Sequence, residues 1–81
     1  MIESLTAETV LQLMELDVAA DPVIAQSPSL GACALDARGA EAAGMRVIAS
    51  QLDVISRWGD GPVTAQWCET VAAELRQRPA A

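Results

Sequence analysis

The chain has 81 residues, which is room for a single domain, residues 1–81, with a core that stabilises folding only modestly. It contains no histidine and two cysteines, Cys33 and Cys68, so that a disulfide framework, a zinc site and the usual general base are all excluded. The formal charge of −6 excludes nucleic-acid binding, because such a surface repels the phosphate backbone.

The charge is unevenly distributed along the chain. Residues 1–36 hold six acids and no base, whereas the remainder balances five acids against five arginines. The sequence shows no targeting signal, since Glu3 and Glu8 stand where a secretory signal has Lys or Arg. No apolar run approaches the length of about 20 residues that spans a bilayer. We therefore expect a cytoplasmic protein with no membrane partner.

The first predicted element is a helix over about residues 6–19. Thr6 has the character of an N-cap, and Glu8 places an acid in the first turn. Apolar residues then recur at helical spacing, at Val10, Leu11, Leu13, Met14 and Val18.

Residues 20–35 are predicted to form one long loop. The stretch Ala20-Asp21-Pro22 ends the first helix, and residues 26–31 contain several turn formers. A loop of this length in a small domain is usually functional or held by its own apolar residues. The residues expected to hold it are Val23, Ile24 and Leu30.

Three further helices are predicted after the loop. The second covers residues 37–50 with Asp36 as its N-cap, and its apolar face carries Ala40, Ala43, Gly44, Val47 and Ile48. A short third helix runs from Leu52 to Trp58, and the last covers residues 64–77. The expected fold is therefore all-α, a small four-helix bundle with a long loop between helices one and two. The predicted shared core is Val10, Leu13, Met14, Val47, Ile48, Ile55, Trp67, Val71 and Leu75.

This order of elements resembles the four-helix bundle of the acyl, aryl and peptidyl carrier proteins. In that family the serine of a Leu-Asp-Ser or Ala-Asp-Ser motif carries 4′-phosphopantetheine at the start of the second helix. Here Leu35-Asp36-Ala37 stands at that point, and Pro62-Val63-Thr64 falls where the family has a second short motif. The chain departs from the family at Ala34, where glycine is usual, and at Arg38, where an apolar residue is usual.

The resemblance implies a carrier protein that tethers intermediates as thioesters in a polyketide, nonribosomal peptide or fatty-acid type pathway. Its cofactor would be 4′-phosphopantetheine at Leu35, Asp36 and Ala37, but the arm cannot be attached to Ala37 because the phosphodiester needs a side-chain hydroxyl. Three explanations stay open: an engineered Ser-to-Ala change, a natural carrier-like scaffold that lacks the serine, and a misplaced motif.

The resemblance also implies partners and a surface that meets them. The partners would be a phosphopantetheinyl transferase, an adenylating ligase and a condensing or tailoring enzyme. The surface around the second helix that would contact them consists of Arg38, Glu41, Met45 and Arg46.

No catalytic or metal-ligating set is predicted. Cys33 has no His or Lys nearby in the sequence to lower its pKa, and Glu15 and Asp17 do not converge on one helix face. We therefore expect no enzyme. The alternative to a carrier is a small acidic helical interaction module, such as an adaptor or an antitoxin-like protein, that binds a basic partner through its N-terminal half.

Overall fold

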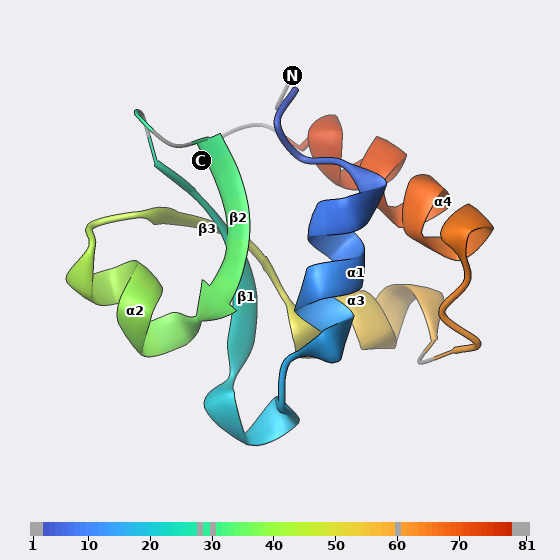
Figure 1. Cartoon of the computed structure of the whole chain (residues 1–81), viewed down its shortest axis with the longest axis horizontal. Coiled ribbons are helices and arrows are strands. Elements are labelled where there is room, and N and C mark those ends of the chain that lie inside the picture. Colours follow the sequence, from blue (N-terminus) through green and yellow to red (C-terminus); the bar gives the residue numbers. More distant parts are fainter. Residues whose placement is uncertain (1–2, 28, 30, 60, 79–81) are drawn as a thin grey trace.

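The computed structural model describes residues 3–27, 29, 31–59 and 61–78, and it shows a mixed α/β fold. A three-stranded antiparallel sheet has the order β2-β1-β3, with helices on both faces (Figure 1). The predicted all-α, four-helix carrier-protein-like bundle is therefore wrong. The strands are β1 (Pro22–Ser27), β2 (Gly31–Asp36) and β3 (Arg46–Ser50), and the helices are α1 (Ala7–Glu15), a 3-10 turn (Val18–Ala20), α2 (Ala37–Ala42), α3 (Gln51–Trp58) and α4 (Ala65–Arg76).

The segment predicted as a long loop folds into a β-hairpin. The pairing of β1 with β2 runs from Pro22 opposite Asp36 to Ser27 opposite Gly31. Gln26 and Ser27 therefore belong to β1, and Gly31, whose φ of 74° favours glycine, begins β2. Leu30, which was predicted to hold the loop, lies outside the described residues. The prediction was wrong because β1 is buried on both faces and lacks the alternation of a half-exposed strand.

The predicted second helix is helical only in its first part. α2 ends before Gly44, which has a left-handed φ of 67°, and residues 46–50 then form β3. This strand pairs antiparallel with β1 and has a bulge opposite Ile24 and Ala25. The strand is favoured because Val47 and Ile48 are β-branched, while glycine weakens a helix through this segment.

The other predicted helices are confirmed, with small shifts at their ends. α1 follows Thr6 as expected and ends at Glu15, before the predicted boundary. The hydroxyl of Ser50 accepts the N–H of Asp53 at 3.0 Å at the start of α3, and Thr64 caps α4 in the same way. These side chains satisfy N–H groups that lack a partner within the helix.

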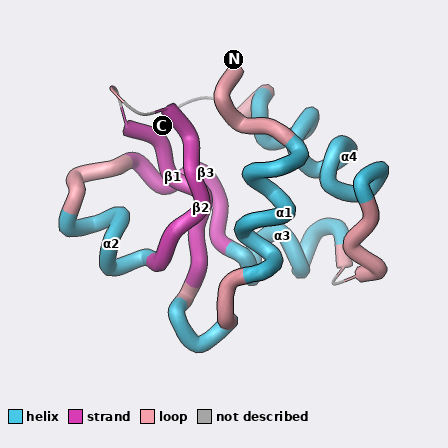
Figure 2. The backbone as a smooth tube through the Cα atoms, in the orientation of Figure 1, coloured by secondary structure: helices cyan, strands magenta, loops and turns pink. Residues whose placement is uncertain are grey.

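The apolar core has one part on each face of β1. Figure 2 shows α1, α3 and α4 on one side of the sheet and α2 on the other. Ile24 is fully buried towards the three helices, whereas Val23 and Ala25 form a small cluster with Ala40 of α2. The buried members of the larger cluster are Leu5, Val10, Leu13, Ile24, Ala49, Val54, Cys68, Val71, Ala72 and Leu75.

Most of the predicted core residues belong to the larger cluster. Val10, Leu13, Val71 and Leu75 are buried in it, and Met14, Ile48 and Trp67 pack against it. Val47 is the clear error, because its side chain is 51% exposed on β3.

Buried Gln51 joins the start of α3 to the end of α1. Its side-chain Nε2 donates to the carbonyl oxygens of Leu13 and Leu16, each at 3.0 Å. Carbonyls in the last turn of a helix have no partner within the helix. The amide of Gln51 therefore adds a second donor to the Leu13 carbonyl, which also accepts the N–H of Leu16 at 3.4 Å, and supplies a donor to the carbonyl of the C-cap residue Leu16.

Truncating Ile24 to Ala should lower the free energy of unfolding by about 2 to 5 kcal/mol, because it opens a cavity beside the central strand. The matched control is Val47→Ala, a truncation of an exposed strand residue, which should change it by no more than about 0.5 kcal/mol. Urea unfolding followed by circular dichroism measures both values. Equal losses in the two variants would contradict the placement of the core.

Candidate functional site

The Leu35-Asp36-Ala37 motif lies at the junction of β2 and α2. The side chain of Leu35 packs against the small cluster beneath α2. Asp36 is the N-cap, as predicted, and its Oδ2 accepts the N–H of Gly39 at 3.0 Å. The N–H of Ala37 donates to the carbonyl oxygen of Asp21 at 3.0 Å. The first amide of α2 is therefore used by the backbone of the preceding segment and does not point to a ligand.

A shallow depression borders this junction. Its lining consists of Leu16, Ala19, Ala20, Asp21, Leu35, Asp36, Ala37 and Arg38. None of these lining residues has a hydroxyl or thiol that could replace the missing serine. The structure thus places the motif at a surface but offers no substitute anchor for the arm.

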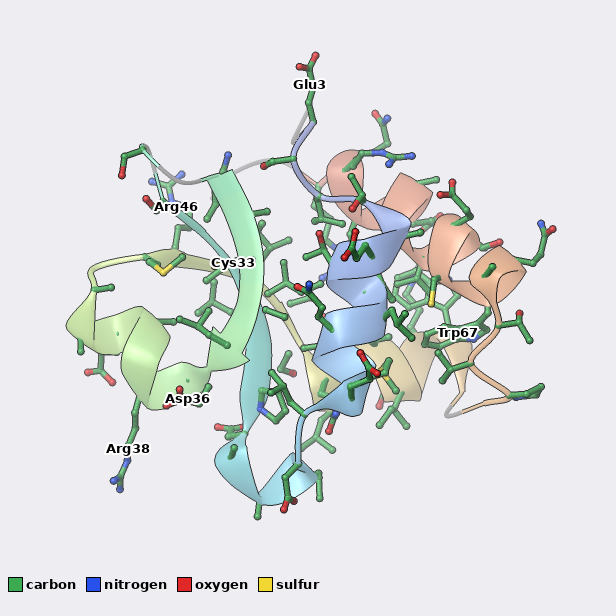
Figure 3. The ribbon with its side chains drawn as sticks, in the orientation of Figure 1. Glu3, Cys33, Asp36, Arg38, Arg46 and Trp67 are labelled. Carbon is green, nitrogen blue, oxygen red and sulfur yellow. The ribbon has the colours of Figure 1, made fainter. Side chains whose placement is uncertain are left out.

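The four residues predicted to face partner enzymes do not form one surface. In Figure 3, Arg38 extends away from the molecule near Asp36, whereas Arg46 lies at the opposite end of the sheet. Glu41 is exposed on α2, and Met45 is half-buried against the small cluster. The structure brings Asp36 and Arg38 together and leaves Arg46 apart from them.

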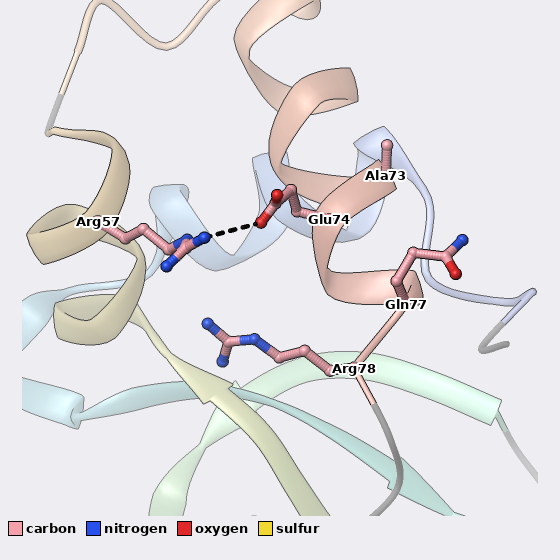
Figure 4. Close-up of a pocket in the computed structure, with 5 residues that line it drawn as sticks. All are labelled: Arg57, Ala73, Glu74, Gln77 and Arg78. Carbon is pink, nitrogen blue, oxygen red and sulfur yellow. Dashed lines mark hydrogen bonds and ion pairs between the residues drawn. The ribbon is translucent and has the colours of Figure 1, made fainter.

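A second depression lies between α3 and the end of α4 (Figure 4), lined by Arg57, Ala73, Glu74, Gln77 and Arg78. Both of its arginines have carboxylate partners. Arg57 Nη2 lies 3.2 Å from Glu74 Oε2, and Arg78 Nη1 lies 2.9 Å from Asp53 Oδ2. These ion pairs neutralise the two guanidinium groups, so the depression has little net attraction for an anion.

A third depression is a groove between α1 and the start of α4. Its surface is mainly apolar, and Leu11 in its lining is 41% exposed. We call it the α1/α4 groove. Its lining residues are Ala7, Glu8, Leu11, Val63, Thr64, Ala65 and Cys68.

The α1/α4 groove has an acidic rim. Glu8 belongs to its lining, at the start of α1. On α4, exposed Glu69 follows the lining residue Cys68. The lining includes no basic residue. The groove therefore combines apolar walls with negative charge.

Cys68 forms part of the apolar wall and is not a nucleophile. Burial raises the pKa of its thiol, and the nearby Glu69 carboxylate raises it further. The thiol therefore stays protonated near neutral pH, and only a thiolate is strongly nucleophilic. In the described part of the chain, no group of three His, Cys, Asp or Glu side chains is placed to hold a metal ion.

The sequence interpretation did not identify the α1/α4 groove. The sequence pattern places Leu11 on the apolar face of the first helix and Thr64 at the start of the last one, and it gives no sign that the two helices meet there. The available signal was that apolar residues at 10, 11, 13 and 14 cover more of the helix than a single packed face requires.

Comparison of the chain with protein-family models, with curated proteins and with solved structures gave no match. No helix among the described residues has both the length and the apolar character needed to cross a membrane.

The two thiols should differ in reactivity in the native protein. Cys33 is half-buried on β2, whereas Cys68 is buried and has a raised pKa, so we expect a thiol reagent to modify Cys33 first. Timed labelling with a chromogenic disulfide at pH 8 measures both rates, and Cys33→Ser identifies the slow phase. The difference should disappear in denaturant. Faster labelling of Cys68 in the native protein would contradict the packing of the groove wall.

Proposed function

We propose that this protein is a small protein-interaction module, and that its α1/α4 groove binds a segment of a basic partner. The segment would insert an apolar side chain between α1 and α4 and place Lys or Arg residues against the rim. The observation that carries the proposal is the combination of exposed Leu11 with Glu8 in one groove.

The apolar part of the groove supports binding of a side chain. Leu11 is exposed even though it neighbours fully buried Val10 on the same helix. Half-buried Val63 lies across from it, beyond the helix cap of Thr64. An apolar side chain that covers such a site removes both surfaces from water, which contributes about 25 cal/mol per Å² of apolar surface buried.

The charge of the chain supports a basic partner. Six acids and no base occur in residues 1–36, and Glu8 brings one of these acids to the α1 side of the groove. Complementary charge speeds association and excludes acidic competitors. A groove whose rim is negative therefore selects among apolar segments by the charge of their flanks.

The carrier function stays a prediction, with less support than before. The order of helices on which the resemblance was based is absent, because the predicted loop is a hairpin and the predicted second helix continues as β3. What remains is the Asp36 cap followed by Ala37 at the start of a helix.

The groove is tested with a synthetic peptide that alternates Arg with Leu, titrated into the labelled protein and followed by amide chemical shifts. We expect changes at α1 and at residues 61–68. Leu11→Asp should weaken binding at least about tenfold, or 1.4 kcal/mol. Its matched control is Leu52→Asp, which makes the same change at a leucine that is 58% exposed outside the groove. Equal effects of the two variants on affinity would show that peptide binding depends on net charge alone and would overturn the proposal.

The carrier prediction is tested separately by the mass of Ala37→Ser after incubation with a broad phosphopantetheinyl transferase and coenzyme A. If the protein is a carrier, the mass of Ala37→Ser increases by that of one phosphopantetheine group. The unchanged chain stays unmodified because it has no hydroxyl at position 37. A known carrier protein in the same reaction is the positive control. If the serine variant stays unmodified while the control carrier is modified, the carrier prediction is wrong.

A further inference from the structure

We propose that the outer edge of β2 is an interaction surface for a second copy of this chain. Two β2 strands pair antiparallel about a two-fold axis, and the two Cys33 side chains lie opposite each other at its centre. This proposal does not depend on the α1/α4 groove.

β2 is an edge strand of the sheet, and it differs from the other edge strand, β3, in the side chains that accompany it. It lies at one end of the strand order, with α1 and α2 on its two faces (Figure 1). At the other margin Arg78 approaches β3, where its Nη1 donates to the carbonyl oxygen of Ile48 at 3.3 Å. Folded proteins commonly protect an edge strand with charge or proline. The stretch from Gly31 to Leu35 has neither.

The direction of the backbone groups on β2 follows from one contact. The N–H of Ala32 donates to Ser4 Oγ at 2.7 Å, so this amide points away from β1. Because alternate residues of an antiparallel strand point to the same side, the N–H and C=O of Ala34 also point outward. Cys33 and Leu35, which are opposite Ala25 and Val23, bond inward to β1. The edge therefore presents the backbone groups of Ala32 and Ala34 to a further strand.

These directions restrict the register of a symmetric pair. Outward-pointing residues must bond to outward-pointing residues, and one register that meets this condition pairs Ala32 of each copy with Ala34 of the other. Cys33 then lies opposite its own equivalent in a non-hydrogen-bonded pair, where the Cα atoms are about 4.5 Å apart. That spacing is within the range of a disulfide, so the pairing can be captured chemically.

Charge favours this antiparallel register. Asp36 is the one charged residue of β2, and antiparallel pairing of residues 31–35 places the two Asp36 carboxylates at opposite ends of the interface. A two-fold register centred on Ala34 would instead place Asp36 opposite Ala32, inside the interface. The register centred on Cys33 thus pairs only the uncharged part of the strand.

Ser4 competes with this association. Its hydroxyl accepts the hydrogen bond from the Ala32 N–H, which the second copy would need. Ser4 also lies close to Gly31: a Cβ atom added at position 31 would lie 2.6 Å from Ser4 Oγ. Ser4 must turn away before the strands pair. Five residues on each strand also bury little surface, so we expect weak association that depends on concentration.

The test combines sedimentation of the full chain over a concentration series with oxidation by diamide. Sedimentation should show the mass rising from 8.5 kDa towards twice that value. Oxidation should join two Cys33 thiols in one disulfide, with diamide accepting their two electrons and two protons. Cys68→Ala should retain the cross-link and Cys33→Ser should lose it. Ser4→Ala should raise the dimer fraction at a fixed concentration, whereas Ser56→Ala, at an exposed serine of α3, should leave it unchanged.

Ala34→Pro removes an outward N–H without removing a bond to β1, so it should abolish the dimer. If this variant does not fold, Cys33→Arg replaces it, because like charges directly opposite each other destabilise a strand pair. We expect Cys33→Arg to weaken association at least tenfold relative to Cys33→Ser. A chain that stays monomeric and is not cross-linked, or a dimer that persists in these edge variants, would overturn the proposal.

Discussion

The burial of β1 on both faces is the constraint on which the rest of the structure depends. Ile24 is covered by the three-helix side of the molecule, while Val23 and Ala25 are covered by α2. A strand in this position also needs backbone partners on both edges, and β2 and β3 supply them. β1 is therefore covered on both faces and paired on both sides, and β2 and β3 are the edge strands of the sheet.

Locally determined features of this fold could be predicted from the sequence, and long-range pairings could not. The caps at Thr6 and Asp36 depend on residues within one helical turn, and both were placed correctly. β3 depends on β1, whose paired residues lie 20 to 27 positions earlier in the chain. Val47 and Ile48 fit a helix face as well as a strand, and only the presence of β1 decides between the two.

The same distinction applies to the candidate sites. The motif at Leu35, Asp36 and Ala37 is contiguous, so its position at the start of a helix could be read from the sequence. The α1/α4 groove joins Leu11 to Val63, which are distant in the chain and whose proximity depends on how two helices pack. The open edge of β2 could not be anticipated either, because the segment was interpreted as a loop.

The amide of Gln51 couples two helices that are far apart in the sequence. It donates to the carbonyls of Leu13 in α1 and of the C-cap residue Leu16, which lie 38 and 35 positions earlier in the chain. An isolated helix as short as α1, with nine residues, is marginal in water. The end of α1 thus gains side-chain hydrogen bonds when α3 docks against it, in addition to its own bond from the N–H of Leu16 to the carbonyl of Leu13. Amide hydrogens in these two helices should consequently exchange with solvent as one cooperative unit, although separate segments of the chain form them.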